Sequence, residues 1–202
     1  AKKQEAEHLT SQIAQPLSRK EIREIARDLR KALDLENEPY FPIMPFVEGI
    51  LPRIDPKFEL EILSKDEMHD FHGLTFPDRH QILLREDVYE RACDGKGRDR
   101  FTVAHEVGHY ILHIPSKIVL AKLEQGTAIP NFMDPEWQAD AFAGELLMPA
   151  HLMKGVSPVI IAENVKSLKL LHATKAEKCN KKRENHCNGS PVDRSNILCK
   201  GT

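Results

Sequence analysis

Two histidines and a glutamate lie within the five residues from His105 to His109, which read His-Glu-Val-Gly-His. Residues four apart on a helix project from the same face, so both imidazoles can bind one ion. Zinc suits neutral imidazole, and when bound it lowers the pKa of a water to about 7 and polarises a carbonyl. Glu106 points beside the ion, where its carboxylate can take a proton from the attacking water and pass it to a leaving nitrogen. The spacing therefore predicts metal-assisted hydrolysis.

The residues around this motif favour a buried catalytic helix over two ordinary histidines on a surface helix. A five-residue motif of this kind also occurs by chance, but a surface helix normally has a charged outer face. The flanking positions here carry no charge: Thr102, Val103, Ala104, Val107, Gly108, Tyr110 and Ile111. We therefore predict a helix from Phe101 to His113, stopped by Pro115, that runs through the middle of a domain.

A catalytic zinc site has three protein ligands and one open position, so a third ligand is needed. In one class of zinc hydrolases this ligand is a His six residues after the second His, but Pro115 occupies that position. Another class uses a Glu on a separate helix, with an Asp one turn later that accepts the other ring N–H of a ligand His. Glu136 and Asp140 have this spacing, and we predict them in these roles, with Asp140 or Glu145 as alternative ligands. The opposing interpretation is that Glu136 merely favours a helix N-terminus.

Peptide hydrolysis also needs a hydrogen-bond donor for the oxyanion that forms at the scissile carbonyl. The sequence does not choose among the candidates, each of which has a packing or surface role as its alternative: Tyr110, His151, His72, Tyr89 and His113. We expect Tyr110 and His113 on the structural face of the motif helix.

The N-terminal half of the chain contains the elements that would support the motif helix. Ser18 and Glu21 have capping-box spacing and precede an apolar stripe, which predicts a helix to about Leu35. Prolines between Pro39 and Pro56 exclude a long regular element, and the apolar residues among them indicate short turns packed on the core. Alternating or apolar runs predict three strands, the last two as a hairpin: Phe58–Leu63, Gly73–Phe76 and Gln81–Leu84.

The C-terminal half supplies the helix of the third ligand. Asp134 and Pro135 form an N-cap and a first-turn proline for a helix to about Leu147, in which Trp137 and Phe142 face the core. We also expect a loop at Arg91–Arg100 and two further helices, at Lys117–Glu124 and Pro158–Leu171. The strand Gln81–Arg85 is interpreted as an edge to which an extended substrate could add, with an internal strand as the alternative.

Charge and cysteine content narrow the class of protein. With 29 Lys and Arg against 31 Asp and Glu, the formal net charge of −2 provides no global field for nucleic acid or membranes. Residues 166–202 are basic, but we expect a solvated tail and no direct nucleic-acid binding. No apolar run approaches the ~18 residues of a spanning helix, and the N-terminus lacks a signal-peptide pattern, so we expect a cytoplasmic protein. The four cysteines are too scattered for a disulfide framework: Cys93, Cys179, Cys187 and Cys199.

These elements together predict an α+β fold, in which a small, mostly antiparallel sheet packs on a helical layer. The metal would lie between the helix of His105 and the helix of Glu136. We expect a metallopeptidase domain at 18–172, a flexible N-terminus at 1–17, and a loosely packed or disordered tail at 173–202.

Two blocks of the sequence, Arg100–His113 and Glu136–Pro149, resemble the ImmA/IrrE family of metallo-endopeptidases. Both blocks match the family in content and order, the hairpin upstream is also similar, and the resemblance covers about residues 18–170. It implies a thermolysin-like catalytic core with a zincin-like active-site helix. The implied ligands are His105, His109 and Glu136, with Glu106 as the catalytic base.

The resemblance also implies a regulatory role in a bacterium, phage or mobile element. Such proteins typically cleave a helix-turn-helix repressor encoded nearby, and some belong to toxin–antitoxin pairs, which implies a protein substrate in a regulatory or stress response. The expected metal is Zn²⁺, with Mn²⁺ as the alternative. A second hypothesis is a toxin–antitoxin or sensor protein that binds a partner and has a structural or weakly active metal site. A third is a hydrolase of small-molecule amides.

Overall fold

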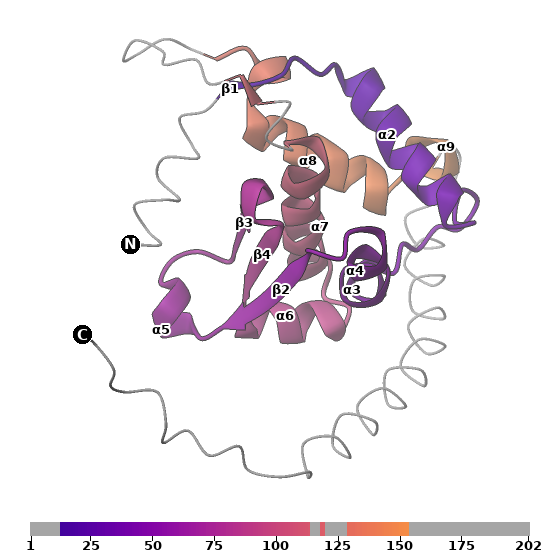
Figure 1. Ribbon diagram of the computed structural model, residues 1–202. Helices are drawn as coiled ribbons and strands as arrows, with labels where there is room; N and C mark the ends of the chain where they lie inside the picture. The colour runs from indigo at the N-terminus through magenta and orange to yellow at the C-terminus, as the bar shows by residue number, and fades with distance from the viewer. Residues whose placement is uncertain (1–12, 114–117, 120–128, 154–202) are drawn as a thin grey trace, which may run out of the picture. The chain divides into compact units, whose positions relative to one another are not determined.

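The computed structural model describes residues 13–113, 118–119 and 129–153, all within one compact unit of the chain, Ala1–Pro158 (Figure 1). The strands are β1 (Ile13–Ala14), β2 (Glu59–Leu63), β3 (Gly73–Phe76), β4 (Gln81–Arg85) and β5 (Ile118–Val119). The helices are α2 (Arg19–Ala32), α3 (Ile43–Pro45), η1 (Phe46–Ile50), α4 (Leu51–Ile54), α5 (Lys65–Met68), η2 (Pro77–Arg79), α6 (Glu86–Cys93), α7 (Gly97–Leu112), η4 (Asn131–Met133), α8 (Pro135–Leu147) and α9 (Ala150–Met153). The predicted helix Pro158–Leu171 and the tail with its cysteines lie outside the described residues, as do residues 1–12.

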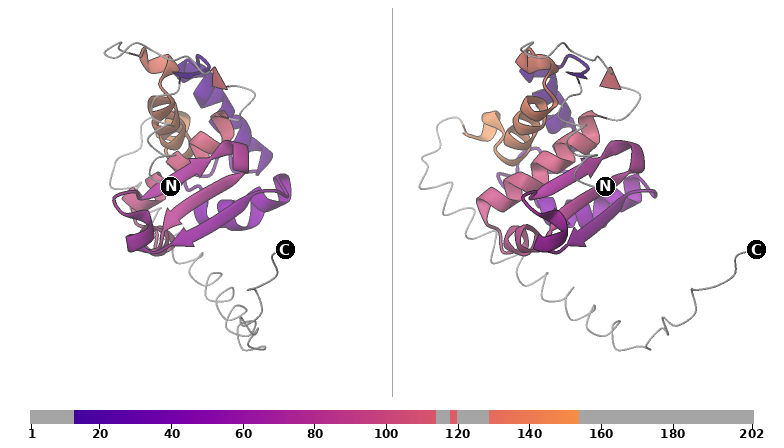
Figure 2. Two further views of the ribbon diagram at one scale, coloured as in Figure 1. Left: turned by 60° about the vertical axis from the view of Figure 1, so that its left-hand side comes forward. Right: turned by 90° about the vertical axis from the view of Figure 1, so that its left-hand side faces the viewer.

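The α+β class is confirmed, but the main sheet is mixed and not mostly antiparallel. Its strand order is β2-β4-β3, in which β3 and β4 form the predicted antiparallel hairpin and β2 runs parallel to β4. The parallel pair arises because the connection through α5 carries the chain from β2 past β4 to the far edge before the hairpin returns it (Figure 2).

The interpretation of Gln81–Arg85 as an edge strand is wrong, because β4 is the central strand. Its residues Ile82 and Leu84 pack into the main core on one face, and Leu83 packs into a smaller cluster on the other. An unbroken apolar run is typical of a strand that is covered on both faces, and the Ile-Leu-Leu run has this pattern. Among the described strands, β3 is the edge on the side of the motif helix.

Helix α2 begins as predicted and ends three residues earlier than expected. The hydroxyl of Ser18 accepts from the backbone N–H of Glu21, and the Glu21 carboxylate accepts from the backbone N–H of Ser18. The buried face contains Ile22 and Ala26, which belong to the predicted stripe, and also the fully buried Arg30. This face packs on α8.

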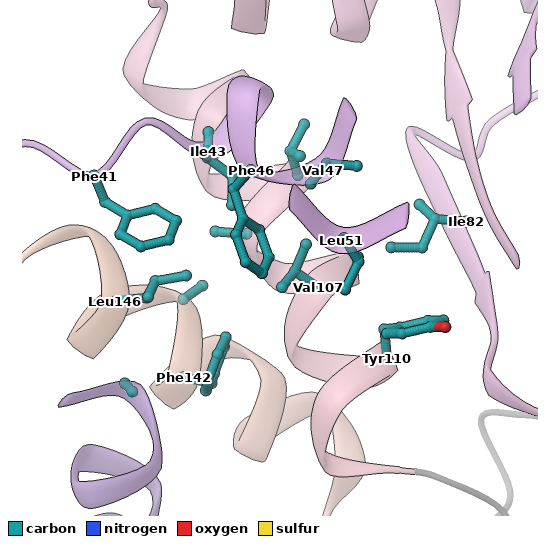
Figure 3. Close-up of a cluster of buried hydrophobic side chains, with 14 of the residues drawn as sticks. Phe41, Ile43, Phe46, Val47, Leu51, Ile82, Val107, Tyr110, Phe142 and Leu146 are labelled. Carbon is teal, nitrogen blue, oxygen red and sulfur yellow. The ribbon is translucent and has the colours of Figure 1, made fainter. Parts of the chain in front are cut away.

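The proline-rich segment packs on the core as short helical turns, which confirms the prediction. Its η1 and α4 turns place Phe46, Val47 and Leu51 in the main core, and Phe41, just before α3, joins them there (Figure 3). There they meet residues of α7 and α8, including Val107, Phe142 and Leu146. Trp137 lies at the margin of the same core, as expected.

The predicted loop at Arg91–Arg100 is wrong over most of its length. Helix α6 runs to Cys93, and α7 begins at Gly97, four residues before the predicted start. The guanidinium of Arg91 forms an ion pair with the buried carboxylate of Asp99 at 2.8 Å. This contact joins the two helices and neutralises the buried carboxylate in the first turn of α7. Only the turn around Gly95, whose φ is 77°, remains between them.

Residues Ile13–Ala14 and Ile118–Val119 pair as antiparallel strands. Ile13–Ala14 fall in the segment 1–17 that the sequence predicts to be flexible, and Ile118–Val119 fall in the predicted helix Lys117–Glu124, so both predictions are wrong at these positions. The next residues of the N-terminal segment are anchored by Phe132, whose carbonyl accepts from the backbone N–H of Leu17 at 2.8 Å.

Helix α7 lies at the centre of the fold. One side contacts β3 and β4, another contacts α6, and a third packs along α8 (Figures 1 and 2). Helix α8 begins as predicted, with the carboxylate of Asp134 accepting from the backbone N–H of Glu136. Within the described part of the chain, every helix is too short or too polar to cross a membrane.

Candidate metal centre

His105 and His109 project from α7 towards the first turn of α8, where they meet Glu136. One ligand atom from each residue lies within 4.8 Å of the others. The two Nε2 atoms are 2.9 Å apart, and the Glu136 carboxylate oxygens lie 3.3 Å from Nε2 of His105 and 3.4 Å from Nε2 of His109. The structure thus brings together the three residues that the sequence predicts as metal ligands.

These distances fit a zinc ion. Ligand atoms about 2.0–2.1 Å from a tetrahedral centre lie about 3.3–3.4 Å from one another. The two distances to Glu136 match this spacing, whereas the two imidazole nitrogens, at 2.9 Å, lie closer together. The donor set is also suitable, because Nδ1 of His105 lies 2.8 Å from the carboxylate of Asp140 and must carry the proton that this contact requires. In the neutral ring, Nε2 of His105 then presents a lone pair, beside a carboxylate that can only accept. These converging acceptors need a positive charge between them, which a proton supplies in the metal-free protein and a metal ion can supply in its place.

The electrostatics of the cluster also favour a positive charge. Burial lowers the pKa of His105, but hydrogen bonding to Glu136, the charge of Glu106 and the contact with Asp140 outweigh it and raise the pKa to about 9. Hydrogen bonds from His105 and His109 hold the pKa of Glu136 well below its usual range. The site thus attracts a cation while its third side, where Glu136 is 54% exposed, remains open to solvent.

The second histidine has a different neighbour. Nδ1 of His109 lies 3.0 Å from Nδ1 of His113, whose Nε2 lies 3.0 Å from Oε1 of Gln138. Both His113 and Gln138 are buried. Burial and the nearby His109 lower the pKa of His113 to about 4, so its ring is neutral. A contact of each ligand imidazole with a neighbouring group is typical of metal sites in proteins.

The carboxylate of Glu106 lies on the sheet side of α7 and is buried. Thr75 of β3 donates its hydroxyl to Oε2 of Glu106 at 2.7 Å. A Cβ atom on Gly73 would lie 2.6 Å from Cγ and Oε1 of Glu106, so only glycine leaves room for this side chain. Gly73 and Thr75 are two residues apart on one strand and therefore share the face towards α7. Together they hold the Glu106 carboxylate.

The close packing of α7 on α8 depends on small residues. A Cβ atom on Gly108 would lie 3.1 Å from the Cα and the carbonyl oxygen of Ala139, and 3.3 Å from the ring of Phe142. The two helices can therefore approach closely at the level of the two histidines. This approach lets a carboxylate from the first turn of α8 reach both imidazoles.

The other candidates from the sequence lie elsewhere. The hydroxyl of Tyr110 donates to Asp55 at 2.5 Å, and its ring packs edge-on against Phe58. Nε2 of His151 contacts the carbonyl oxygen of Glu36 on the protein surface. The structure therefore brings neither Tyr110 nor His151 into contact with the metal-ligand group, whereas His113, another of the candidates, contacts the ring of His109.

The alternative third ligands are also engaged in other contacts. Glu145 is buried under α2, where its carboxylate pairs with Arg23 at 3.0 Å and with Arg19 at 3.4 Å. Asp140 contacts Nδ1 of His105, on the opposite side of the ring from the Nε2 that faces Glu136.

The sequence does not predict the supporting roles of Gly73, Thr75 and Gln138, and it places His113 among the oxyanion candidates or on the structural face of the helix, not beside His109. A signal for His113 was present, because positions 105, 109 and 113 follow a four-residue spacing that places them along one helix face. The roles of Gly73 and Thr75 depend on which face of the hairpin meets α7, and no local pattern contains that information.

Residues 62–161 match the family model described as the IrrE N-terminal-like domain of the M78 peptidases, and these residues include the whole cluster. Neither the curated proteins nor the solved structures gave a match to this chain. The matched region contains the His-Glu-Val-Gly-His helix and the Glu136 helix in the order expected of a metallopeptidase. The chain, through this domain, belongs to the ImmA/IrrE family of metallopeptidases.

Proposed function

We propose that this protein is a zinc-dependent endopeptidase that cleaves a cytoplasmic helix-turn-helix repressor in a regulatory or stress response. The observation that carries the proposal is the convergence of His105, His109 and Glu136, with ligand atoms within 4.8 Å of one another, beside the buried carboxylate of Glu106. A bound zinc ion would supply a polarised scissile carbonyl and an attacking water of lowered pKa. The three residues would hold the ion, and the identity of the metal as zinc is part of the proposal.

Glu106 would act as the general base and then as the general acid. Its carboxylate, held by the hydroxyl of Thr75 at 2.7 Å, takes the proton of the attacking water and delivers it to the leaving nitrogen. Asp140 would fix the ring of His105 by accepting from its Nδ1. The domain carrying these residues would span 18–172.

A protein substrate is supported by family membership and by the position of β3. This strand lies beside α7 and pairs with β4 on one side, while no other described strand pairs with its second side. An extended peptide can add to such an edge through main-chain hydrogen bonds. The choice of a repressor or antitoxin as substrate rests on the resemblance to the family.

The test uses the purified protein and, as the proposed substrate, a small helix-turn-helix protein encoded by a neighbouring gene. The wild-type protein with one equivalent of zinc should cut this partner at one or a few sites, detected by mass spectrometry. Adding a chelator should stop cleavage. Glu106→Gln should bind zinc with nearly unchanged affinity and yet lose cleavage by at least ~100-fold, the contribution typical of a general base.

The outcomes separate the hypotheses. Cleavage at the normal rate by Glu106→Gln would rule out the general-base role. A stable complex of the two wild-type proteins without cleavage, unaffected by chelator, would favour the alternative of a toxin–antitoxin or sensor protein that acts by binding. If Glu136 and not Asp140 is the third ligand, Glu136→Ala should lose zinc binding, and Asp140→Ala should bind zinc more tightly than Glu136→Ala does.

A further inference from the structure

The ring of His109 is part of a chain of contacts that ends on the protein backbone. The chain passes through His113 at the end of α7 and Gln138 in α8. His113 and Gln138 are both buried, and the sequence motif of the metal site does not contain Gln138. Each group has a fixed number of N–H hydrogens, so the donor and the acceptor of each hydrogen bond follow in order from Gln138 to His109.

Gln138 fixes the first direction. Its amide nitrogen donates to the carbonyl oxygens of Gln15 at 2.9 Å and Phe132 at 2.8 Å. A side-chain amide has two N–H bonds, and a backbone carbonyl can only accept, so both hydrogens are used there. The oxygen end of Gln138 must therefore face His113, and it can only accept.

His113 passes this direction on to the metal site. Its Nε2, 3.0 Å from the amide oxygen of Gln138, must carry a hydrogen. The ring is buried, and its polar contacts are with His109 and Gln138, neither of which is an acid. A neutral imidazole has one N–H, so Nδ1 of His113 is an acceptor. It lies 3.0 Å from Nδ1 of His109, which must supply the hydrogen.

We propose that His113 and Gln138 are positioning residues, which hold the proton of His109 on Nδ1 and so direct the Nε2 lone pair towards Nε2 of His105 and Glu136. The two ligand histidines then have matched tautomers that are set by different means. His105 is set by the carboxylate of Asp140, whereas His109 is set by a neutral relay anchored on the backbone at Gln15 and Phe132. Because His113 is neutral, it orients His109 without changing the total charge around the ion. The inference rests on the proposed metal site.

The first experiment needs no variant. In the zinc-loaded protein with ¹⁵N-labelled histidine, long-range nitrogen–proton NMR spectra should show His113 neutral, with its hydrogen on Nε2. That hydrogen should exchange slowly with water, because it is buried against Gln138. A spectrum with the hydrogen on Nδ1 of His113, or on both nitrogens, would overturn the relay.

The second experiment compares zinc affinity, measured by competition with a chromophoric chelator, in three variants. His113→Leu and Gln138→Met remove the relay but keep an apolar side chain of similar size, and zinc affinity should fall about 10- to 100-fold, as is typical for groups that orient a metal ligand. His113→Asn keeps an oxygen near the position of Nδ1 and should recover most of the affinity. A residue that serves only in packing would give the opposite order, because leucine suits a buried site better than asparagine.

The results also separate this inference from the proposed function. Wild-type protein that binds no zinc overturns both. Wild-type protein that binds zinc tightly, together with a His113→Leu variant that is folded and binds equally well, overturns the positioning role alone. If His113→Leu fails to fold, the NMR spectrum of the wild-type protein and the affinity of Gln138→Met still decide the question.

Discussion

At the scale of single residues, the orientation of Glu106 depends on a neighbour that is distant in the sequence. Thr75 donates its hydroxyl hydrogen to the Glu106 carboxylate at 2.7 Å, and both side chains are buried. A hydrogen bond to an ionised group in such surroundings contributes about 1.5–3 kcal/mol, roughly twice a neutral one. Thr75 therefore determines where the proposed base points, although it is expected to touch no substrate.

Replacing the hydroxyl of Thr75 with a methyl group tests this role. Thr75→Val keeps the shape and the β-branched form of the side chain, and it should lower kcat about 10- to 100-fold with little change in KM or zinc content, because a misdirected base affects the chemical step. Thr75→Ser restores the hydroxyl and should recover most of kcat. The measurement is cleavage of the substrate identified by the two-protein digestion, and equal kcat values for Thr75→Val and the wild-type protein would contradict the role.

Asp55 joins three segments through its carboxylate. It accepts from the hydroxyl of Tyr110 at 2.5 Å and contacts Nδ1 of His80 at 2.5 Å, so it links the end of α4 with α7 and the hairpin turn. The hydrogen bond from Tyr110, followed by that from His80, lowers the pKa of Asp55 from 3.8 to about 2. A carboxyl whose pKa is lower in the folded than in the unfolded protein contributes stability above the unfolded value, and that stability is lost as the pH falls to the folded value.

Asp55→Asn should therefore lower the free energy of unfolding at pH 5–7, and its difference from the wild-type protein should shrink as the pH falls from about 4 to about 2. Urea unfolding of the metal-free proteins at several pH values gives this difference. Asp28→Asn, on the exposed face of α2, is the matched control and should change little at any pH. A constant difference between Asp55→Asn and the wild-type protein across this range would show that the charge of Asp55 does not matter.

At the scale of elements, the metal group depends on how closely α7 and α8 approach. Gly108→Ala places a methyl group 3.1 Å from the backbone of Ala139, which can yield only if α8 moves as a whole. Alanine stabilises a helix by about 1 kcal/mol relative to glycine, but overpacking costs about 1–3 kcal/mol, so a small net loss of stability is expected. The larger effect should be on zinc affinity, because the shift moves Glu136 relative to both histidines.

Gly144 in α8 provides a matched control for this substitution. A Cβ atom at Gly144 meets nothing within 4 Å, so Gly144→Ala should raise stability by up to about 1 kcal/mol and leave zinc affinity unchanged. Thermal unfolding and chelator competition measure both quantities. If Gly108→Ala binds zinc as tightly as Gly144→Ala, the close approach of the helices is not what positions Glu136.

The elements that could be predicted from the sequence are those whose ends are set by local signals. Helix α2, the hairpin and the start of α8 depend on local signals such as the Ser18 capping box and the Asp134 N-cap, and these predictions are confirmed. The grouping of His105 and His109 follows from helix periodicity alone. The four-residue spacing between Glu136 and Asp140, which predicts the third ligand, is also a local signal.

The features that were not predicted depend on tertiary contacts. Arg30 lies on the same face of α2 as Ile22 and Ala26 and is fully buried. Its burial is possible because its guanidinium donates to the carbonyl oxygen of Leu146 near the end of α8. The start of α7 depends on the ion pair between Arg91 and Asp99. The place of β2 beside β4 follows from a crossover, which no pattern of hydrophobic residues specifies.

At the scale of the described unit, two buried arginines hold the segment that follows α2. Arg100 of α7 stacks on the ring of Tyr40 and donates to the carbonyl oxygen of Phe41 at 2.7 Å. Arg30 lies over the ring of Phe41. Both cations bind main-chain oxygens and aromatic faces, and by these contacts the α2–α8 layer is joined to α7 and to the sheet beyond it.

A metal ion would add a second connection between the same layers. Its proposed ligands come from α7 and α8, so the bound ion opposes separation of the helices, whereas the unfolded chain loses the site. At a free zinc concentration 1,000 times Kd, binding to the folded state alone adds about 4 kcal/mol. For a unit of this size, that corresponds to a rise in Tm of roughly 10 °C.

Zinc removal should therefore lower Tm of the wild-type protein by roughly this amount in a thermal scan with chelator, and added zinc should restore it. Glu136→Ala removes a ligand whose side chain is 54% exposed, so its metal-free Tm should be close to that of the wild-type protein, while the response to zinc should largely disappear. Asp134→Ala, which removes the N-cap of the same helix, is the contrasting control. It should lower Tm both with and without zinc and preserve most of the difference between them. An equal response to zinc in the wild-type protein and Glu136→Ala would place the ion elsewhere, because only an ion held between α7 and α8 ties its stabilising effect to this carboxylate.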